Sequence, residues 1–167
     1  MPRDTTTTWN RVSEADVRRQ VGVLANLPWP ISFADVCSVV TTQLGWTEWI
    51  EGIFLAHLGV DPGAGRIFKL EDGEVSTIQL SLTDSSNDES DERDTFQHEA
   101  FSFYAQILKD MYGPGTHAPF PRKHDEMFWD LPSGARVVLA VGIATASTSI
   151  LSPRLAQARR INARGEH

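Results

Sequence analysis

The sequence predicts an α+β fold in which a mostly antiparallel sheet of about five strands, built from hairpins, carries its helices on one face. Segments with helical spacing of apolar residues alternate with pairs of strand-like runs, and short turns join each pair. The chain has 167 residues, which suits a single domain. The second face of such a sheet is expected to be partly exposed, which suits partner binding.

Three regions are expected along the chain. A disordered lead, residues 1–11, precedes a single α+β domain over residues 12–163, which contains an acidic loop at residues 83–94. The lead has no apolar run of the kind that a secretory signal requires.

Two helices are predicted before the sheet. Ser13 is expected to cap the first helix, and the prolines at positions 28 and 30 end it. Ser32 is expected to cap the second, which ends near Gly45.

The run "WTEWIEGIFLAHL", residues 46–58, is rich in aromatic and branched residues and predicts one strand with a bulge at Gly52. Residues 66–82 predict a hairpin around Asp72-Gly73, a dipeptide suited to tight turns. The second arm of this hairpin alternates apolar and polar residues, so one face should be buried and the other should meet water.

A long helix is predicted from Asp94, as its N-cap, to Gly113, because residues between them form a wide apolar stripe. A second hairpin follows around "PSG" at residues 132–134, with a further short strand at residues 147–151. Ser152-Pro153 has the residue types that begin a last helix.

The net charge of the chain is concentrated in one place. The formal charge is 15 − 22 = −7, and the stretch "TDSSNDESDERD", with six carboxylates and one arginine, contributes 1 − 6 = −5. The remainder is close to neutral, which argues against a nucleic-acid-binding protein because that class requires a basic surface.

Cysteine usage and hydropathy indicate the compartment. Cys37 is the only cysteine, so no internal disulfide can form, and this fits a reducing cytoplasm. The longest apolar run is too short to span a bilayer, so no membrane partner is expected.

Motifs for catalysis, cofactors and metals are incomplete. His98-Glu99 lacks the second histidine of a zinc protease helix, and the acidic stretch lacks the glycine of a calcium loop. No nucleophile elbow or phosphate-binding loop is present. We therefore expect no cofactor, no metal and no catalytic residue, and an enzyme that uses clustered carboxylates is the least favoured interpretation.

Protein binding is the favoured function class. The acidic stretch suits electrostatic docking on a basic partner, although a mobile, solvated linker is the simpler interpretation of its composition. Trp29, held between two prolines, suits an exposed anchor. The predicted partner-binding residues are Asp84, Asp88, Glu89, Asp91, Glu92, Asp94 and Trp29.

Several segments resemble a known family. "LGW" at residues 44–46, "MYGPG" at 111–115 and "FWDLPSGARVVLAVG" at 128–142 are similar to segments of small actinobacterial proteins of unknown function. Members are encoded near polymorphic toxins and type VII secretion substrates, so the resemblance implies an immunity protein. It implies no catalytic residue.

The expected function is thus an immunity protein that binds and neutralises a cognate protein toxin in the cytoplasm. A secretion chaperone or adaptor for an exported substrate is the alternative, because the layering of helices and hairpins is also similar to small secretion chaperones. The sequence leaves a homodimer open as well.

Overall fold

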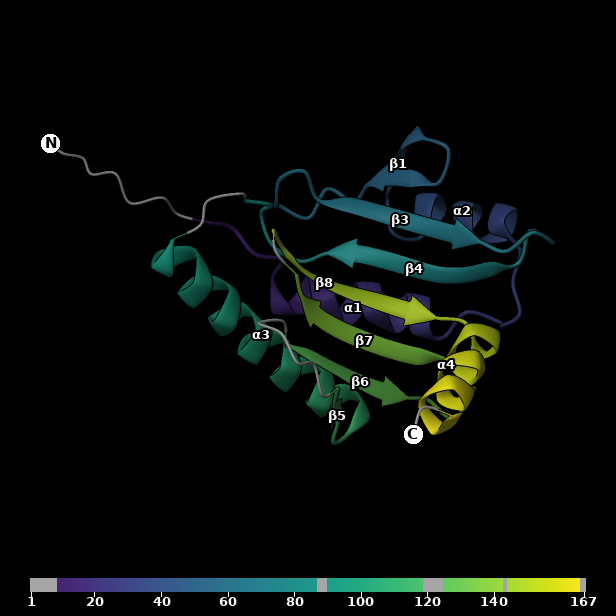
Figure 1. Ribbon diagram of the computed structural model, residues 1–167. Helices are drawn as coiled ribbons and strands as arrows, with labels where there is room; N and C mark the ends of the chain where they lie inside the picture. Colours follow the sequence, from purple (N-terminus) through teal and green to yellow (C-terminus); the bar gives the residue numbers. More distant parts are fainter. Residues whose placement is uncertain (1–8, 87–89, 119–124, 143, 166–167) are drawn as a thin grey trace, which may run out of the picture.

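The computed structural model describes residues 9–86, 90–118, 125–142 and 144–165. These residues form an antiparallel sheet of eight strands with helices packed on it (Figure 1). The strands are β1 (Thr47–Ile50), β2 (Ile53–Leu55), β3 (Ala64–Lys69), β4 (Val75–Ser81), β5 (Thr116–His117), β6 (Glu126–Asp130), β7 (Arg136–Val141) and β8 (Ala146–Leu151). Their order in the sheet is β1-β2-β3-β4-β8-β7-β6-β5.

Two of the predicted hairpins form the centre of this sheet. β3 and β4 meet at a turn in which Gly73 has a φ of 87°, and β6 and β7 meet at a turn in which Gly134 has a φ of 95°. Positive φ values of this size favour glycine. The pairing of β4 with β8, which places Ile78 opposite Ile150, joins the two hairpins into one sheet.

Helices cover the two faces of the sheet unequally (Figure 1). The first three, α1 (Glu14–Ala25), α2 (Phe33–Thr42) and α3 (Asp91–Tyr112), enclose the main core with side chains such as Val137 and Ile150. The last helix, α4 (Pro153–Gly165), packs on the opposite face, where its buried Ala156 contacts Val138 and Leu151. Alternate residues of a strand point to opposite faces, so adjacent β7 and β8 residues belong to different clusters.

Serine caps begin α1, α2 and α4 at the predicted positions. The Ser13 and Ser32 hydroxyls accept backbone N–H groups at 3.2 and 3.1 Å, and Ser152 accepts the Leu155 N–H at 3.1 Å. Each bond satisfies a donor that the helix itself leaves unpaired.

The predicted start of α3 at Asp94 is wrong. Ser90 is the N-cap: its hydroxyl accepts the N–H of Arg93 at 3.1 Å, and its carbonyl accepts that of Asp94 at 3.1 Å. Asp91, Glu92 and Asp94 therefore lie in the first helical turn, where carboxylates interact favourably with the helix dipole. Gly113 ends the helix as predicted.

Much of the predicted acidic loop at 83–94 is tied to the fold. Thr83 is fully buried and forms a β-bridge with Arg11, and its hydroxyl contacts that of Thr145 at 2.9 Å. The predicted lead 1–11 is likewise ordered at its end, where Trp9 packs on Phe96 with ring centroids 5.4 Å apart. Residues 1–8 and 87–89 lie outside the described part of the chain.

The buried Tyr104 joins three parts of the fold. Its hydroxyl on α3 lies 2.6 Å from the carbonyl oxygen of Val12, before α1, and 3.0 Å from that of Leu82, after β4. Val12 and Leu82 are also linked directly, because the Val12 N–H donates to the Leu82 carbonyl at 2.8 Å. Burial raises the pKa of Tyr104 far above its usual range, so the hydroxyl stays protonated.

A second tie holds the strands near β1. Trp46 is buried, and its indole N–H donates to the Gln20 side chain at 2.9 Å. Its ring packs directly over Gly65 of β3, where a Cβ atom would overlap the ring. Glycine is therefore required at this position by close approach.

The predicted α+β class and antiparallel sheet are confirmed, but two details differ. The sheet has eight strands instead of about five, because residues 46–58 turn at Glu51 and Gly52 into two strands, because β5 was not predicted, and because the further strand predicted at residues 147–151 joins the sheet as β8. The helices also occupy both faces, since α4 packs opposite the other three. None of the described helices is both long and apolar enough to cross a membrane.

Candidate functional site

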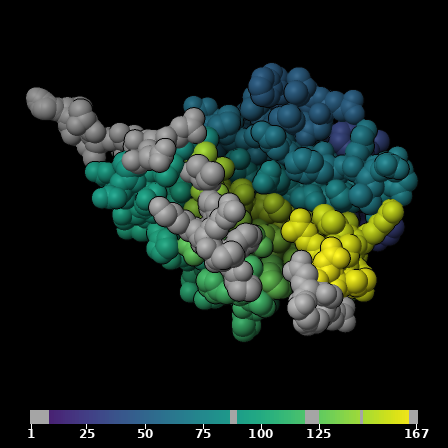
Figure 2. Space-filling model, viewed as in Figure 1, coloured from purple at the N-terminus to yellow at the C-terminus, as the bar shows by residue number. Residues whose placement is uncertain are grey.

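The face of the sheet that carries α4 is only partly covered by the described elements, and we call it the open face. Along β4 and β8 its side chains are half-buried, except for Leu151, which α4 covers, whereas the side chains between them on the other face are buried. The half-buried side chains at the centre are polar and short: Thr77, Gln79, Ser81, Ser147 and Ser149. Figure 2 views the molecule from this side, with the blue β1–β2 region at the upper rim and yellow α4 at the lower right.

A groove of about 350 Å³ lies on the open face between the central strands and α4. Its floor includes the Thr77, Gln79, Ser147 and Ser149 side chains. The pairing register places Gln79 opposite Ser149, so these polar groups are direct cross-strand neighbours.

Two ionisable side chains border this groove, Glu126 from β6 and Arg159 from α4. Burial raises the pKa of Glu126, while the positive charges of Arg159 and Arg136 partly oppose that rise. No ion pair joins Arg159 to any residue that the structure describes. The groove thus combines neutral hydrogen-bonding groups, one carboxyl group and one guanidinium group with the apolar side chains of Phe68, Val138, Ala140 and Leu151.

The arrangement offers binding groups rather than a catalytic unit. The histidines that the structure describes lie elsewhere: His57 contacts the Thr47 hydroxyl at 2.8 Å, His98 pairs with Asp125 at 3.3 Å, and the His117 ring packs near Phe101. Ser147 and Ser149 therefore have no imidazole base among the groove residues. Within the described ranges no cluster of three or more potential metal ligands occurs.

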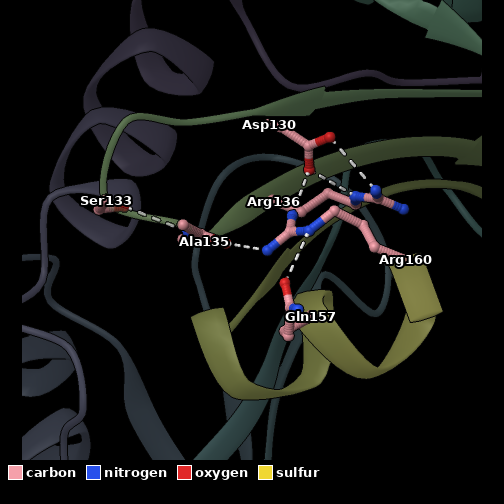
Figure 3. A network of polar contacts seen from close by, with 7 residues as sticks. Asp130, Ser133, Ala135, Arg136, Gln157 and Arg160 are labelled. Atoms are coloured by element: carbon pink, nitrogen blue, oxygen red, sulfur yellow. Dashed lines mark hydrogen bonds and ion pairs between the residues drawn. The ribbon is translucent and has the colours of Figure 1, made fainter.

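The last helix is held beside the groove by charge-assisted hydrogen bonds (Figure 3). Asp130 accepts from Arg136 at 2.8 and 3.2 Å and from Arg160 of α4 at 2.9 Å. Burial alone would raise the pKa of Asp130, but the two arginines outweigh it and hold the pKa below its usual range. Arg154, also on α4, pairs with Asp72 at 2.9 Å.

A second feature lies at the β1–β3 end of the sheet and is an apolar corner, which we define as Trp49, Ile50, Ile53 and Phe68. Trp49, Ile50 and Phe68 are 69%, 55% and 47% exposed, unusually high values for large apolar side chains. Ile50 of β1 pairs with Ile53 of β2, and Ile53 pairs in turn with Arg66 of β3. Phe68 follows Arg66 by two residues on β3 and therefore points to the same face as Arg66. β1 is a terminal strand, so its outer backbone groups have no strand partner in the described sheet.

The predicted acidic residues do not act as one group. Asp84 accepts the backbone N–H groups of Asn10 at 2.7 Å and Asp61 at 2.8 Å, so it ties two segments together. Asp91, Glu92 and Asp94 are exposed on the first turn of α3. Asp88 and Glu89 lie outside the described residues.

Trp29 is placed differently from an exposed anchor. It is half-buried and packs against the main core, and its indole N–H is buried with no hydrogen-bond partner in the described part of the chain.

Sequence reasoning missed the apolar corner and the groove. The signal for the corner was Trp49-Ile50 immediately before the Glu51-Gly52 turn, but it was absorbed into one long predicted strand. The alternation of Gln79 and Ser81 with apolar residues did indicate a wet face. It could not indicate that Glu126 and Arg159 border that face, since both are distant in sequence.

Comparison with known proteins identifies the family. The chain belongs to a family of unknown function, DUF6301, whose model matches residues 15–152. No curated protein and no solved structure matches the chain. The matched region starts within α1 and ends at the N-cap of α4.

Proposed function

From membership in a family with no assigned activity, we propose that this chain is a non-catalytic protein-binding protein whose partner is a basic protein. The observation that carries the proposal is the apolar corner at the end of the sheet formed by the terminal strand β1 and its neighbours β2 and β3. Contiguous exposed apolar side chains next to polar ones are typical of protein interaction sites. Tryptophan is enriched among the residues that dominate binding energy, and Trp49 is the most exposed large apolar side chain described.

The charges around the corner favour a basic partner. Glu48 and Glu51 flank Trp49 and Ile50, and both are exposed. Two cations lie near the corner as well: Lys69 pairs with Glu51 at 3.1 Å, and the exposed Arg66 is the cross-strand neighbour of Ile53. Glu48 forms no ion pair with a described residue, so its carboxylate is available to a basic protein.

Long-range charge adds to this local preference. The chain carries a formal charge of −7, and Asp91, Glu92 and Asp94 are exposed on α3. Such a charge accelerates encounter with a basic protein without requiring contact at α3 itself. In this proposal Asp84 supports the fold and Trp29 supports the core, so neither is required at the interface.

A toxin is the partner we propose, and its neutralisation in the cytoplasm is the activity. This choice is supported by the resemblance to proteins encoded beside polymorphic toxins. An exposed apolar corner flanked by carboxylates is also the combination that a tight inhibitor of a basic enzyme requires.

The test uses the full chain and the product of the adjacent reading frame, with affinity measured by calorimetry. Trp49→Ala should weaken binding by about 30-fold or more, the effect of losing a dominant contact of about 2 kcal/mol. Ile50→Ser should weaken it too, and Ile161→Ser on α4 is the matched control because both isoleucines are 55% exposed. Unchanged affinity in Trp49→Ala and Ile50→Ser would remove the corner as the interface.

The same complex distinguishes an immunity protein from the alternative, a secretion chaperone. An immunity protein should retain affinity for the folded toxin domain and should restore growth when both are co-expressed. A chaperone should instead bind the export segment of the partner and should not bind the isolated toxin domain. Absence of any complex with the neighbouring product would refute both versions.

A further inference from the structure

The groove on the open face contains polar side chains that the fold does not use. Thr77, Gln79, Ser147 and Ser149 line it, and none of these side chains hydrogen-bonds to a described protein group. By contrast, Thr148, which points to the opposite face, donates to the Val138 carbonyl at 2.9 Å. The groove therefore presents several donors and acceptors that remain available to a ligand.

Arg159 differs from the other α4 arginines whose side chains are described. Arg154 pairs with Asp72 at 2.9 Å, and Arg160 pairs with Asp130 at 2.9 Å, so both hold the helix in place. Arg159 lines the groove and forms no ion pair with a described residue. Its guanidinium group is not needed to dock α4.

Glu126 supplies the opposite charge on the same groove. It is half-buried, and Arg159 is close enough to affect it electrostatically although the two form no direct ion pair. A separated carboxylate and guanidinium beside unpaired hydroxyl groups leave room for a ligand that bridges them. Guanidinium groups bind carboxylates through two parallel hydrogen bonds, and carboxylates bind ammonium groups strongly.

We propose that this groove binds a small zwitterion of the α-amino acid class. The ligand's carboxylate pairs with Arg159, and its ammonium group pairs with Glu126. Its side chain lies over the hydroxyl and amide groups of Ser147, Ser149 and Gln79. The groove shares Phe68 with the apolar corner, but the proposal does not rest on the protein-binding function proposed above.

The dimensions and charges of the groove favour this ligand class. Glu126 and Ser147 stand on either side of β7 in one cross-strand row, so about 10 Å separates their backbones. That span and the volume of about 350 Å³ suit a molecule of amino-acid size. A simple anion would be repelled by Glu126, and a simple cation by Arg159, whereas a zwitterion satisfies both.

Calorimetric titration of the full chain with glycine, L-alanine and L-glutamine tests the proposal. We expect saturable binding of at least one of these probes. Acetate and methylammonium, each with one of the two charges, should bind at least about tenfold more weakly, since each forfeits a charge-assisted contact. No saturable binding of any of the three amino acids, or equal binding of the single-charge probes, would overturn the proposal.

Two variants assign the contacts. Arg159→Gln and Glu126→Gln should each weaken binding by about tenfold or more, whereas Lys109→Gln on α3 should leave it unchanged. Arg160→Gln is the control for helix docking, because Arg160 holds α4 but does not line the groove. If Arg160→Gln weakened binding as much as Arg159→Gln, Arg159 would act through the position of α4 and the assigned contact would be wrong.

Discussion

Replacement of Tyr104 by phenylalanine tests how the fold joins the segment before α1 to the sheet. The change removes one hydroxyl and keeps the buried ring in place. In the wild type that hydroxyl lies 2.6 Å from the Val12 carbonyl oxygen and 3.0 Å from the Leu82 carbonyl oxygen, and all three residues are fully buried.

The size of the effect depends on which hydrogen-bond donors each carbonyl oxygen retains after the hydroxyl is removed. Leu82 still accepts the Val12 N–H at 2.8 Å, so it remains satisfied after the substitution. The Val12 carbonyl has no other hydrogen-bond partner among the described residues, and an unsatisfied buried acceptor costs about 1–3 kcal/mol. We therefore expect Tyr104→Phe to lower the free energy of unfolding by about 2 kcal/mol.

Urea denaturation, followed by far-UV circular dichroism, measures this difference. A loss of about 2 kcal/mol corresponds to a shift of roughly 1 M in the urea midpoint and roughly 4–8 °C in Tm for a chain of this size. The matched control is Tyr112→Phe, since Tyr112 is the only other tyrosine and is half-buried on the same helix. It should change stability by less than about 0.5 kcal/mol. A Tyr104→Phe protein as stable as this control would refute the reasoning.

Three further perturbations have defined outcomes. Gly65→Ala should destabilise by about 1–3 kcal/mol through overlap with the packed indole, whereas Gly22→Ala, whose Cβ meets open space in α1, should stabilise by about 0.5–1 kcal/mol in the same urea assay. Asp84→Ala should destabilise by about 1–2 kcal/mol because two backbone N–H groups lose their acceptor, while Glu92→Gln should leave the urea midpoint unchanged. The lowered pKa of Asp130 means that its contribution is present above about pH 4 and is lost as the pH falls through the folded-state pKa, so the midpoints of wild type and Asp130→Asn should converge at acid pH; a constant difference down to low pH would contradict this.

Local signals in the sequence were sufficient for most of the element boundaries. Ser13, Ser32 and Ser152 cap helices because a serine hydroxyl can reach a free backbone N–H three residues on, which depends on nothing distant. The turn at Gly73 formed for a similarly local reason. The predicted N-cap of α3 was wrong because the closely spaced Asp91, Glu92 and Asp94 suit an N-cap or a first turn equally well, and Ser90 is the N-cap.

Pairing over long distances in sequence could not be predicted in the same way. β8 lies at the centre of the sheet only because β4 and β7 flank it, and its own pattern, "ASTSIL", is short and polar. The position of α4 on the opposite face depends on Ala156 fitting over Val138 and Leu151 and on ion pairs to distant acids. The groove could not be predicted either, because its polar floor and its two charged side chains come from segments that are distant in sequence.

The boundary of the family match separates the two proposals. The apolar corner lies between residues 49 and 68, inside the matched region 15–152, so it can be a property of the family. Arg159 lies beyond that region, on a helix whose N-cap is the last matched residue. Among the residues that line the groove, Arg159 alone lies outside the match, so family membership carries no information about this contact and zwitterion binding depends on this chain's own last helix. A negative result at the groove would leave the protein-binding proposal intact, and loss of the corner as an interface would leave the groove untouched.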